Sequence, residues 1–443
     1  MAAIDKSIYE KFIVESIDGK TVDISFGVIQ FSYFENIFSP YITARAVVVN
    51  TGNTVEDDKG IPQSIYNGLP LRGGERVSIK IDTNSEENKP LNFTGDNALY
   101  VSSITNVIKK AERETFVLNL VSRESITNET SRVGKKFSQK ISQSVKEIIS
   151  DFLLTDKNTN IDETENNYAF IGNLRKPFTV LTWLASKSVP GSGQNAVVGG
   201  KSSTAGFFFY ETKDGFNFKS IDALCTQDPV GQPYVYQPGV IDVDDATKDY
   251  RIIQYSLNRD NNFVENLERG AYCTHRMYYN PLFGTFTTQE QGIFSTKQFE
   301  GKLNNLGKDF KLETPQYDKS GKTVGELPSR IVSGVLDIGT LEKKNKNSFK
   351  KNADPMEFHS QAMMRYNLIF NIQMIATIPL NTNLVAGSLI ECVFPKITTD
   401  VEKESDQEQS GLYMVKELVH HYESDGSFTK LKLIKDTFGK RDK

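Results

Sequence analysis

The chain has 443 residues, more than one hydrophobic core normally supports, so we expect two to four domains. Its 28 Phe and 18 Tyr, together with many turn-forming residues, indicate a β-rich protein. The 52 Lys and Arg against 56 Asp and Glu give a formal net charge of −4, which offers no electrostatic reason to bind nucleic acid or an anionic membrane.

The first residues, MAAIDKSIYEKF, lack the apolar core of a signal peptide, and no window approaches the ~18 apolar residues of a spanning helix. We therefore expect a protein made in the cytoplasm, with no membrane anchor. The three cysteines, Cys225, Cys273 and Cys392, are widely spaced and odd in number. We expect them to be reduced and buried rather than part of a disulfide framework.

Alternation of apolar and polar residues, which is typical of strands, dominates the first part of the chain. It occurs in SIYEKFIVESI, TVDISFGVIQFSY, ITARAVVV, RVSIKID and TFVLNLVS, each bounded by Gly, Asn, Pro or Asp. Residues 1–125 are therefore predicted to form one antiparallel β-domain.

Helical and strand patterns mix after this point, which predicts a mixed α/β domain over residues 126–240. Apolar residues at helical spacing predict a helix over 141–152, and Pro177 suits the first position of a second helix. The segment GFFFYETKDGFNFKSID predicts a hairpin that turns at Lys213, Asp214 and Gly215.

The next two stretches differ in composition. Residues 241–300 contain strand patterns in YRIIQYSL and GAYCTHRMYY. Residues 301–350 are rich in charge, Gly and Pro and lack sustained periodicity, so we predict an extended surface excursion.

A helix is expected to open the last stretch, residues 351–443. Asp354, Pro355 and Glu357 match an N-cap, a first helical residue and the third-position partner of a capping box, so the helix should run to about Arg365. Four strands are predicted to follow, in LIFNIQMIATI, SLIECVF, LYMVKELVHHY and FTKLKLIKD.

The end of the chain repeats a pattern found in the first domain. The segment that starts at Leu71, LRGGERVSIKI, resembles the segment that starts at Leu384, LVAGSLIECVF, in its Leu, its Gly and its alternating apolar residues. Leu99-Tyr100 and Leu412-Tyr413 follow at the same interval. The similarity indicates either a duplicated β-module or two unrelated hairpins that share alternation. If the module is duplicated, three chains around an axis present six modules in a ring.

Further segments carry a resemblance to a known family. They are YNGLPLRGGERVSIKI, PFTVLTWLASKSV, GFFFYETKDGFNFKSID and GLYMVKELVHHYESDGSFTKLKLIKD, spread over most of the chain. Together they resemble the baseplate hub proteins of T-even-like contractile-tailed phages, which are related to the spike-base proteins of type VI secretion systems.

This resemblance implies an α+β, mostly antiparallel β fold with two tail-tube-like β-barrel domains and a mixed α/β middle domain. The first barrel would be residues 1–125. The second would be residues 351–443, completed by strands around 245–280. Residues 241–300 are therefore expected to be either strands of this second barrel or an insertion. The excursion at 301–350 would decorate the exterior.

The implied function is structural: a homotrimeric ring with pseudo-six-fold symmetry that joins the hexameric tail tube to the trimeric central spike. The implied partners are the tail tube protein, the central spike protein, the tape measure protein and surrounding baseplate proteins, with no sequence-specific nucleic acid. The implied location is the tail baseplate of the virion, with assembly in the host cytoplasm. Loops at the barrel rims would make the contacts, and the candidates are Asn50–Asn67 and Asp400–Gly411.

A phosphate-binding loop is suggested by Gly199–Ser203, GGKSS. However, Asn195 stands where such a loop needs Gly. A helical pattern also precedes the segment, whereas a phosphate-binding loop follows a strand and opens a helix. We interpret the segment as a plain loop.

A calcium loop is suggested by Asp242, Asp244 and Asp245. Counted from Asp242, an EF-hand needs Gly and Glu where the chain has Thr247 and Ile253. The calcium motif is therefore missing.

Other reactive residues give no pattern either. Cys273 and His275 share one side of a strand but need Cys392 to converge from a distance to hold zinc, and isolated cysteines are more often simply buried. His420 and His421 should face opposite sides of their strand. No GxSxG or HExxH motif occurs. We therefore predict no catalytic, cofactor-binding or metal-binding residue, no cofactor and no enzymatic activity.

Two other functions remain open from the sequence. A cell-wall-degrading tail enzyme needs two carboxylates at a defined separation in a cleft. A receptor- or carbohydrate-binding tail module needs an exposed aromatic groove.

Overall fold

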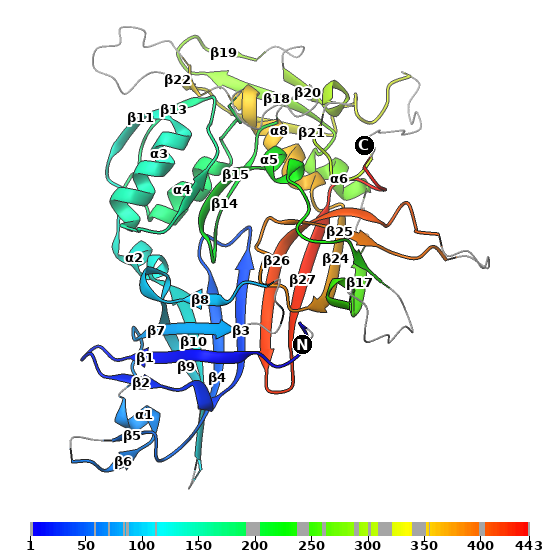
Figure 1. Ribbon diagram of the computed structural model, residues 1–443. Helices are drawn as coiled ribbons and strands as arrows, with labels where there is room; N and C mark the ends of the chain where they lie inside the picture. Colours follow the sequence, from blue (N-terminus) through cyan, green and yellow to red (C-terminus); the bar gives the residue numbers. More distant parts are fainter. Residues whose placement is uncertain are drawn as a thin grey trace.

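The computed structural model describes residues 3–56, 59–69, 71–82, 85, 88–110, 113–191, 204–236, 248–258, 263–287, 292–299, 303–308, 321–338, 351–353, 355–397 and 404–441. Strands dominate and most of their pairings are antiparallel, so the fold is α+β and mostly antiparallel β, as predicted. Figure 1 shows the long strands in the lower half of the molecule and most helices in the upper half.

The first part of the chain is built almost entirely of strands. Its elements are β1 (Ile8–Glu15), β2 (Thr21–Asp23), β3 (Val28–Asn36), β4 (Thr43–Thr51), β5 (Val55–Glu56), β6 (Pro62–Gln63), α1 (Ile65–Gly68), β7 (Arg76–Asp82), β8 (Leu91–Phe93), β9 (Leu99–Lys109) and β10 (Arg113–Ser122). The predicted alternation is confirmed in β7, where Val77, Ile79 and Ile81 are buried and the residues between them are half-buried.

A middle region mixes helices and strands. Its elements are α2 (Arg123–Thr130), β11 (Lys136–Lys140), α3 (Ile141–Ile148), β12 (Thr159–Ile161), β13 (Asn167–Ile171), α4 (Pro177–Ala185), β14 (Phe207–Thr212), β15 (Gly215–Ser220) and α5 (Ile221–Thr226). The helix predicted at 141 is confirmed and continues as a π-helical turn to Leu153. Pro177 opens α4, and the predicted β14–β15 hairpin is present.

Strands and helices then alternate to the end of the chain. The elements are β16 (Tyr234–Val235), β17 (Gln254–Asn258), α6 (Phe263–Arg269), β18 (Cys273–Asn280), β19 (Thr285–Phe286), β20 (Ile293–Ser295), β21 (Arg330–Val335), β22 (Asp337–Ile338), β23 (Lys351–Ala353), α8 (Pro355–Leu368), β24 (Ile372–Pro379), β25 (Leu389–Val393), β26 (Gly411–Glu423) and β27 (Ser427–Lys435). The helix α8 begins at Pro355 as predicted and ends three residues beyond Arg365. Asp354 lies outside the described residues.

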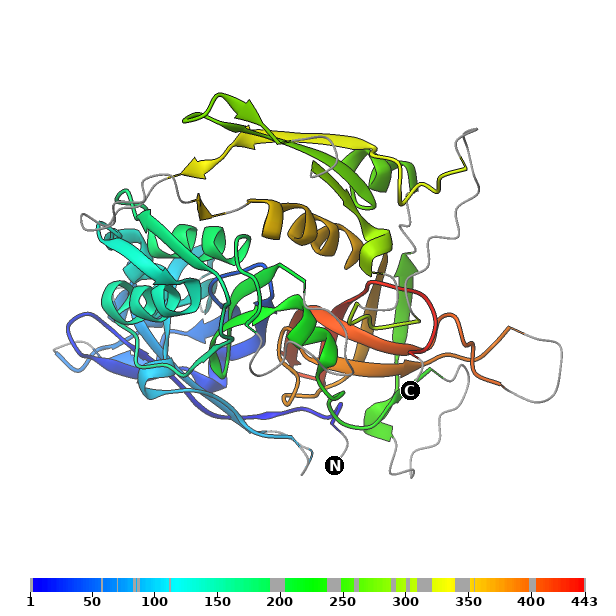
Figure 2. The same cartoon turned by 90° about the horizontal axis from the view of Figure 1, so that it is seen from above.

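A separate four-stranded sheet forms from β19, β18, β20 and β21. Figure 2 shows this sheet as an outer layer, with α8 beneath it. The stretch 301–350, expected to be a surface excursion, supplies β21, which pairs in parallel with β18, and contains the buried Leu303 and Leu306. β18 therefore does not join the strands of the last domain, whereas β17 does.

Two sets of five strands share one topology. In the first module, β3, β4, β7, β9 and β10 are arranged in the order β3-β4-β10-β9-β7. In the second module, β17, β24, β25, β26 and β27 are arranged in the order β17-β24-β27-β26-β25. Every pairing is antiparallel. Numbered by chain order, both modules read 1-2-5-4-3, which favours duplication over two unrelated hairpins.

The modules form one continuous sheet because β3 of the first pairs with β26 of the second. In the described residues the path is open, from β17 at one end to β2 at the other. The two predicted barrels are therefore not closed among the described strands. Two cores lie against this sheet. One contains Phe31 and Phe116 together with Tyr422 from β26, and the other contains Leu418 and Leu433.

Candidate functional site

The two modules match in atomic detail at a glycine corner that precedes β7 and β25. In the first module Gly74 N donates to Val101 O over 2.7 Å, and in the second Gly387 N donates to Val415 O over 2.8 Å. At each corner a second hydrogen bond runs in the opposite direction: Val101 N donates to Glu75 O, and Val415 N donates to Ser388 O. Both glycines have a positive φ, +93° and +86°, which glycine adopts most readily. The same corner structure thus occurs in both modules.

One detail of the sequence repeat is wrong. Leu99-Tyr100 was aligned with Leu412-Tyr413, yet Val77 lies opposite Leu99 while its counterpart Ile390 lies opposite Tyr413. The second module therefore carries one extra residue before β26. Because side chains alternate across a strand, a one-residue shift exchanges the inner and outer faces. This explains why Leu99 is buried whereas Leu412 is only half-buried.

The junction between the modules is the pairing of β3 with the second half of β26. Seven residue pairs join the strands antiparallel, beginning with Asn36 opposite Glu417. Phe31 and Tyr422, also opposite each other, are fully buried with ring centroids 6.0 Å apart. Full burial of such side chains stabilises a fold by roughly 1.5–3 kcal/mol each. Backbone pairing and a shared core therefore hold the modules in one fixed arrangement.

Glu35 is buried where three parts of the chain meet. Alternation along β3 places this carboxyl on the inward face with Phe31 and Tyr33. Its oxygens accept hydrogen bonds from Lys213 N and Ala386 N, both over 2.7 Å, and from the Tyr33 hydroxyl. Burial raises the pKa of Glu35 to about 7, against the lowering effect of these donors. Glu35 thus ties the first module to the second and to the β14–β15 hairpin.

A buried ion cluster joins the first module to the middle region. Lys157 Nζ lies 2.7 Å from both Glu124 Oε2 and Glu211 Oε1. Glu211 also accepts from Ser122 Oγ over 2.6 Å and from Ile42 N over 3.1 Å. Burial alone would lower the pKa of Lys157, but the two carboxylates outweigh it and leave that pKa raised. The side chains of all three charged groups are nearly inaccessible to solvent, so the cluster fixes structure and exposes no reactive atom.

A second buried cluster is centred on Arg365 of α8. Its guanidinium lies 3.4 Å from both Asp222 Oδ1 and Asp436 Oδ2, and donates to Asn304 O over 3.1 Å. Asp222 stands in the first turn of α5, and Asp436 directly follows β27. The cluster therefore joins helices α5 and α8 to the last strand of the second module.

Two cavities bear on the alternative functions, because an enzyme or a sugar-binding module needs a lined recess. Among the described residues, the cavity beside the β14–β15 hairpin has Asp214 as its one acidic lining residue, and the cavity between α4, α8 and β21 has Asp337. A glycosidase needs two carboxylates on opposite sides of the scissile bond. Neither cavity offers that pair.

The second cavity contains the aromatic side chains that a sugar-binding groove requires. However, Lys187 Nζ lies 5.2 Å from the ring centroid of Trp183 and 5.3 Å from that of Tyr168. A cation held against ring faces is a favourable internal contact. One face of each of these two rings is thus already engaged within the chain.

The three cysteines are free and buried, as predicted. Burial raises the pKa of Cys273 to about 11, and it raises the pKa values of Cys225 and Cys392 further. Cys392 in β25 lies in a different sheet from Cys273 and His275 in β18, and these three residues form no metal-binding group. No three His, Cys, Asp or Glu side chains of the described ranges form a group suited to a metal ion.

The adjacent histidines face opposite sides of β26, as predicted. His420 is buried, with Nδ1 2.9 Å from Thr429 Oγ1 and its ring stacked on Tyr33. Burial lowers the pKa of His420 to about 3, so the ring is neutral. His421 Nδ1 instead lies 2.9 Å from Ser32 Oγ. Both side chains belong to the junction between the modules.

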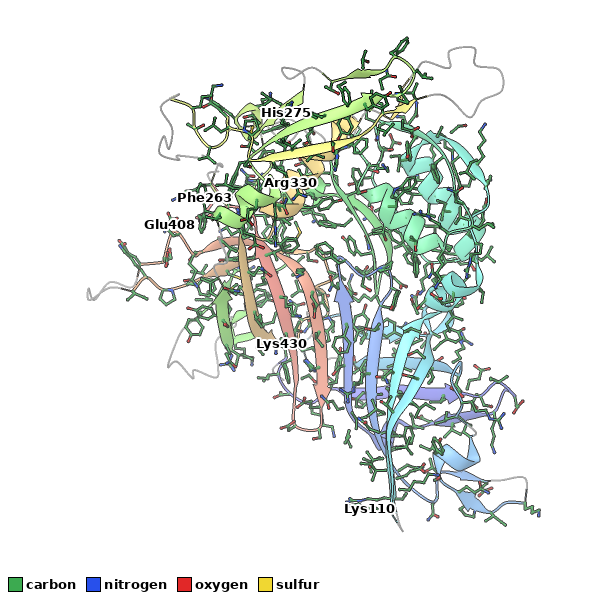
Figure 3. The ribbon with its side chains drawn as sticks, turned by 180° about the vertical axis from the view of Figure 1, so that it is seen from behind. Lys110, Phe263, His275, Arg330, Glu408 and Lys430 are labelled. Atoms are coloured by element: carbon green, nitrogen blue, oxygen red, sulfur yellow. The ribbon has the colours of Figure 1, made fainter. Side chains whose placement is uncertain are left out.

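Several sequence candidates lie partly or wholly outside the described residues. These are Asn195, Gly199–Ser203, Asp242, Asp244 and Asp245, together with residues 57–58 and 400–403 of the two loop candidates. Of the two loop candidates, 50–67 contains β5, β6 and the start of α1, and in 400–411 Glu408 forms an exposed ion pair with Lys308 over 2.7 Å. In Figure 3 Glu408 lies at the side of the molecule, far from the β9–β10 tip marked by Lys110. Among the described helices, none is both long and apolar enough to span a membrane.

No protein-family model matches the chain, and no curated protein matches it. Solved structures with a similar course include a tail protein from Neisseria meningitidis MC58, with a TM-score of 0.46, 10% identity, and coverage of 96% of each chain. The prophage MuSo2 43 kDa tail protein from Shewanella oneidensis gives a TM-score of 0.49 and 9% identity over 96% of this chain and 98% of that one.

A third similar structure is the c3393 protein of E. coli, a component of the type VI secretion system, with a TM-score of 0.41 and 8% identity over 94% of this chain and 76% of that chain. These three similar structures are thus two tail proteins, one of them from a prophage, and a secretion-system component. Because their TM-scores lie below 0.5, the function of this chain has to be argued from its own architecture.

Proposed function

We propose that this chain is a structural subunit of a phage tail baseplate hub, in which three copies form a ring of six β-modules. The ring would join the hexameric tail tube on one face to the trimeric central spike on the other. The observation that carries the proposal is the repeated 1-2-5-4-3 strand order, with the two copies already joined edge to edge within one chain. The phage-tail setting comes from the sequence resemblance described above.

The duplication resolves a symmetry mismatch. A six-fold tube presents six equal surfaces, whereas a three-fold spike presents three. A chain with two similar modules offers six tube-facing surfaces and three copies of everything else, so one ring matches both partners. The middle region and the outer β18 sheet occur once per chain and would lie outside the ring, available to surrounding baseplate proteins.

Such a role needs rigidity rather than chemistry. The junction at β3 and β26, the Glu35 hydrogen bonds and the two buried ion clusters each join parts that are distant in the sequence. They fix the modules relative to each other and to the middle region, which suits a component that transmits load.

The test is the mass and shape of the assembled protein. Native mass spectrometry should show three times the chain mass of 49.8 kDa, and negative-stain class averages should show a ring with a central opening and six similar lobes. Because an obligate ring interface typically buries about 2,000 Å² or more, the trimer should persist at low micromolar concentration. A stable monomer without rings would refute the proposal.

A further inference from the structure

One junction in the proposed ring is visible within the chain, and the topology indicates where the other must lie. Three chains with six modules need three junctions inside chains and three between chains. Inside the chain, the first strand of one module, β3, pairs with the fourth strand of the other, β26. The matching edges left over are the first strand of the second module, β17, and the fourth strand of the first, β9.

The residues of β17 can be matched to those of β3 by following the ladders. Ala46 on β4 and Ala376 on β24 occupy the same place, each buried and opposite the leucine at the centre of the fifth strand. Ala46 lies opposite Phe31, and Ala376 lies opposite Tyr255. Tyr255 therefore stands where the first module has Phe31, and the serine after each one matches as well.

The residues of β9 and β26 can be matched in the same way. Thr115 on β10 and Phe428 on β27 are separated by the same interval as the two corner glycines. Thr115 lies opposite Ile108, and Phe428 lies opposite His421. Ile108 on β9 therefore stands where the second module has His421. The β9–β10 ladder contains one extra β9 residue between Thr105 and Ile108, which the β26–β27 ladder lacks, so the match holds on the Ile108 side of that bulge.

The known junction then gives the register of the missing one. Within the chain, Ser32 on β3 lies opposite His421 on β26. Ser256 is the counterpart of Ser32, and Ile108 is the counterpart of His421, so the same pairing puts Ser256 opposite Ile108. We propose that β17 of one chain pairs antiparallel with the outer edge of β9 in a second copy, with Ser256 facing Ile108. This inference rests on the ring proposed above.

Exposure agrees with this assignment. Phe31 and Tyr33, which the internal junction covers, are 0% exposed, whereas their counterparts Tyr255 and Leu257 are only half-buried. Ile108 is 57% exposed, and the residues around it from 105 to 109 are exposed too. In the described residues, neither Tyr255–Leu257 nor the outer edge of Ser102–Ile108 has a strand partner. Open edges that carry apolar side chains are sites of strand addition.

The partner has to be another copy of this chain. Figure 1 shows β17 and β9 on opposite sides of the molecule, so one chain cannot join its own two edges. An interface between two different surfaces of the same chain is heterologous and repeats from copy to copy until the rotation closes a ring. The internal junction joins the equivalent edges of the two modules, and the interface between chains would repeat that arrangement.

A disulfide placed across the edges tests the register. In antiparallel pairs, opposite residues have Cβ atoms about 4.5–5.5 Å apart, whereas a disulfide needs about 3.5–4.5 Å, so an oxidised cysteine pair forms after a shift of about 1 Å. The variant S256C/I108C in the full chain should give disulfide-linked species of two and three chain masses that disappear on reduction. The matched control, S256C/S102C, moves the second cysteine about 20 Å along the same strand and should remain uncrosslinked. The native cysteines are buried and do not compete.

The outcomes separate the two proposals. Crosslinking in S256C/I108C but not in the control supports the junction. A trimer without that crosslink, or with equal crosslinking in both variants, overturns the junction and leaves the ring standing. A protein that stays monomeric overturns both.

Amide hydrogen exchange on the unaltered protein provides a second readout that needs no substitution. If the edges pair, the amides of 254–258 and 102–108 should be protected in the trimer to within about tenfold of those of 417–423, the internal reference junction. Rapid exchange at both edges in a trimer whose 417–423 segment is protected would overturn the assignment.

Discussion

Glu35 offers the sharpest test of how the modules are held together. Its carboxyl is 1% exposed, and burial raises its pKa to about 7 from an ordinary value of 4.5. The folded protein therefore binds a proton more tightly at this site than the unfolded chain does. Between about pH 4.5 and pH 7, Glu35 is more fully protonated in the folded state than in the unfolded state. The contribution of Glu35 to the free energy of unfolding therefore falls as the pH rises.

The size of this effect follows from the two pKa values. A change from 4.5 to about 7 corresponds to about 3 kcal/mol between the protonated and ionised limits. The substitution Glu35→Gln removes the titration. It also leaves one backbone donor, at Lys213 or Ala386, without its oxygen, which costs about 1–3 kcal/mol at every pH. That constant cost lowers the variant's free energy of unfolding by the same amount at every pH, so it does not change how that free energy depends on pH.

The measurement is equilibrium urea unfolding of the wild type and Glu35→Gln between about pH 4 and pH 8. The difference in unfolding free energy, wild type minus variant, should fall by about 3 kcal/mol as the pH rises through this range. The control Asp425→Asn changes an exposed carboxyl at the tip of the β26–β27 hairpin and should follow the wild-type curve. A flat difference for Glu35→Gln would show that the carboxyl titrates normally and that its burial is misjudged.

Three further substitutions test other parts of the same argument. Arg365→Met strands two buried carboxylates and should destabilise the protein by about 3–5 kcal/mol in urea unfolding, whereas Arg269→Met breaks an exposed ion pair and should cost less than about 1 kcal/mol. Gly74→Ala faces only its positive φ and should cost about 1 kcal/mol, but at Gly387 a Cβ would lie 2.4 Å from a buried tyrosine hydroxyl, so Gly387→Ala should lower the melting temperature clearly more. His420→Gln should remove the stability that the wild type loses as the pH falls from about 6.5 towards 3, because the buried ring has a pKa lowered to about 3 and must stay neutral; equal acid sensitivity in thermal melts of both proteins would contradict this.

Local structure was accessible from the sequence because it depends on local patterns. Apolar alternation located most of the long strands, and Pro177 and Pro355 marked the starts of their helices. The repeat that begins at Leu71 and Leu384 gave a duplicated module as one of two interpretations. Alternation also put Glu35 on the same face as Phe31 and Tyr33, so an inward carboxylate could have been noticed from the sequence alone.

The sequence did not reveal which strands pair with each other. A period of two tells which side chains share a face but not which strand lies alongside. The pairing of β3 with β26 joins residues almost 400 positions apart, and the parallel pairing of β18 with β21 crosses a stretch whose composition suggested no regular structure. The extra residue before β26 was also invisible, because the Leu-Tyr pair repeats at the same interval even though its structural register has moved by one.

The same contacts bear on how a ring of this chain would close. A ring of three copies contains two kinds of junction in alternation, one within each chain and one between neighbouring chains. The rotation from module to module across the first kind and the rotation across the second kind must together equal a third of a turn. Inside the chain, that rotation is set by the seven residue pairs between β3 and β26, by the Glu35 carboxyl, which accepts from Lys213 N and Ala386 N, and by the buried contact of Phe31 with Tyr422. The junction between chains has fewer described residues, since β17 runs only from Gln254 to Asn258. Any adjustment needed for closure would therefore occur between chains, while the angle within each chain stays that of the monomer.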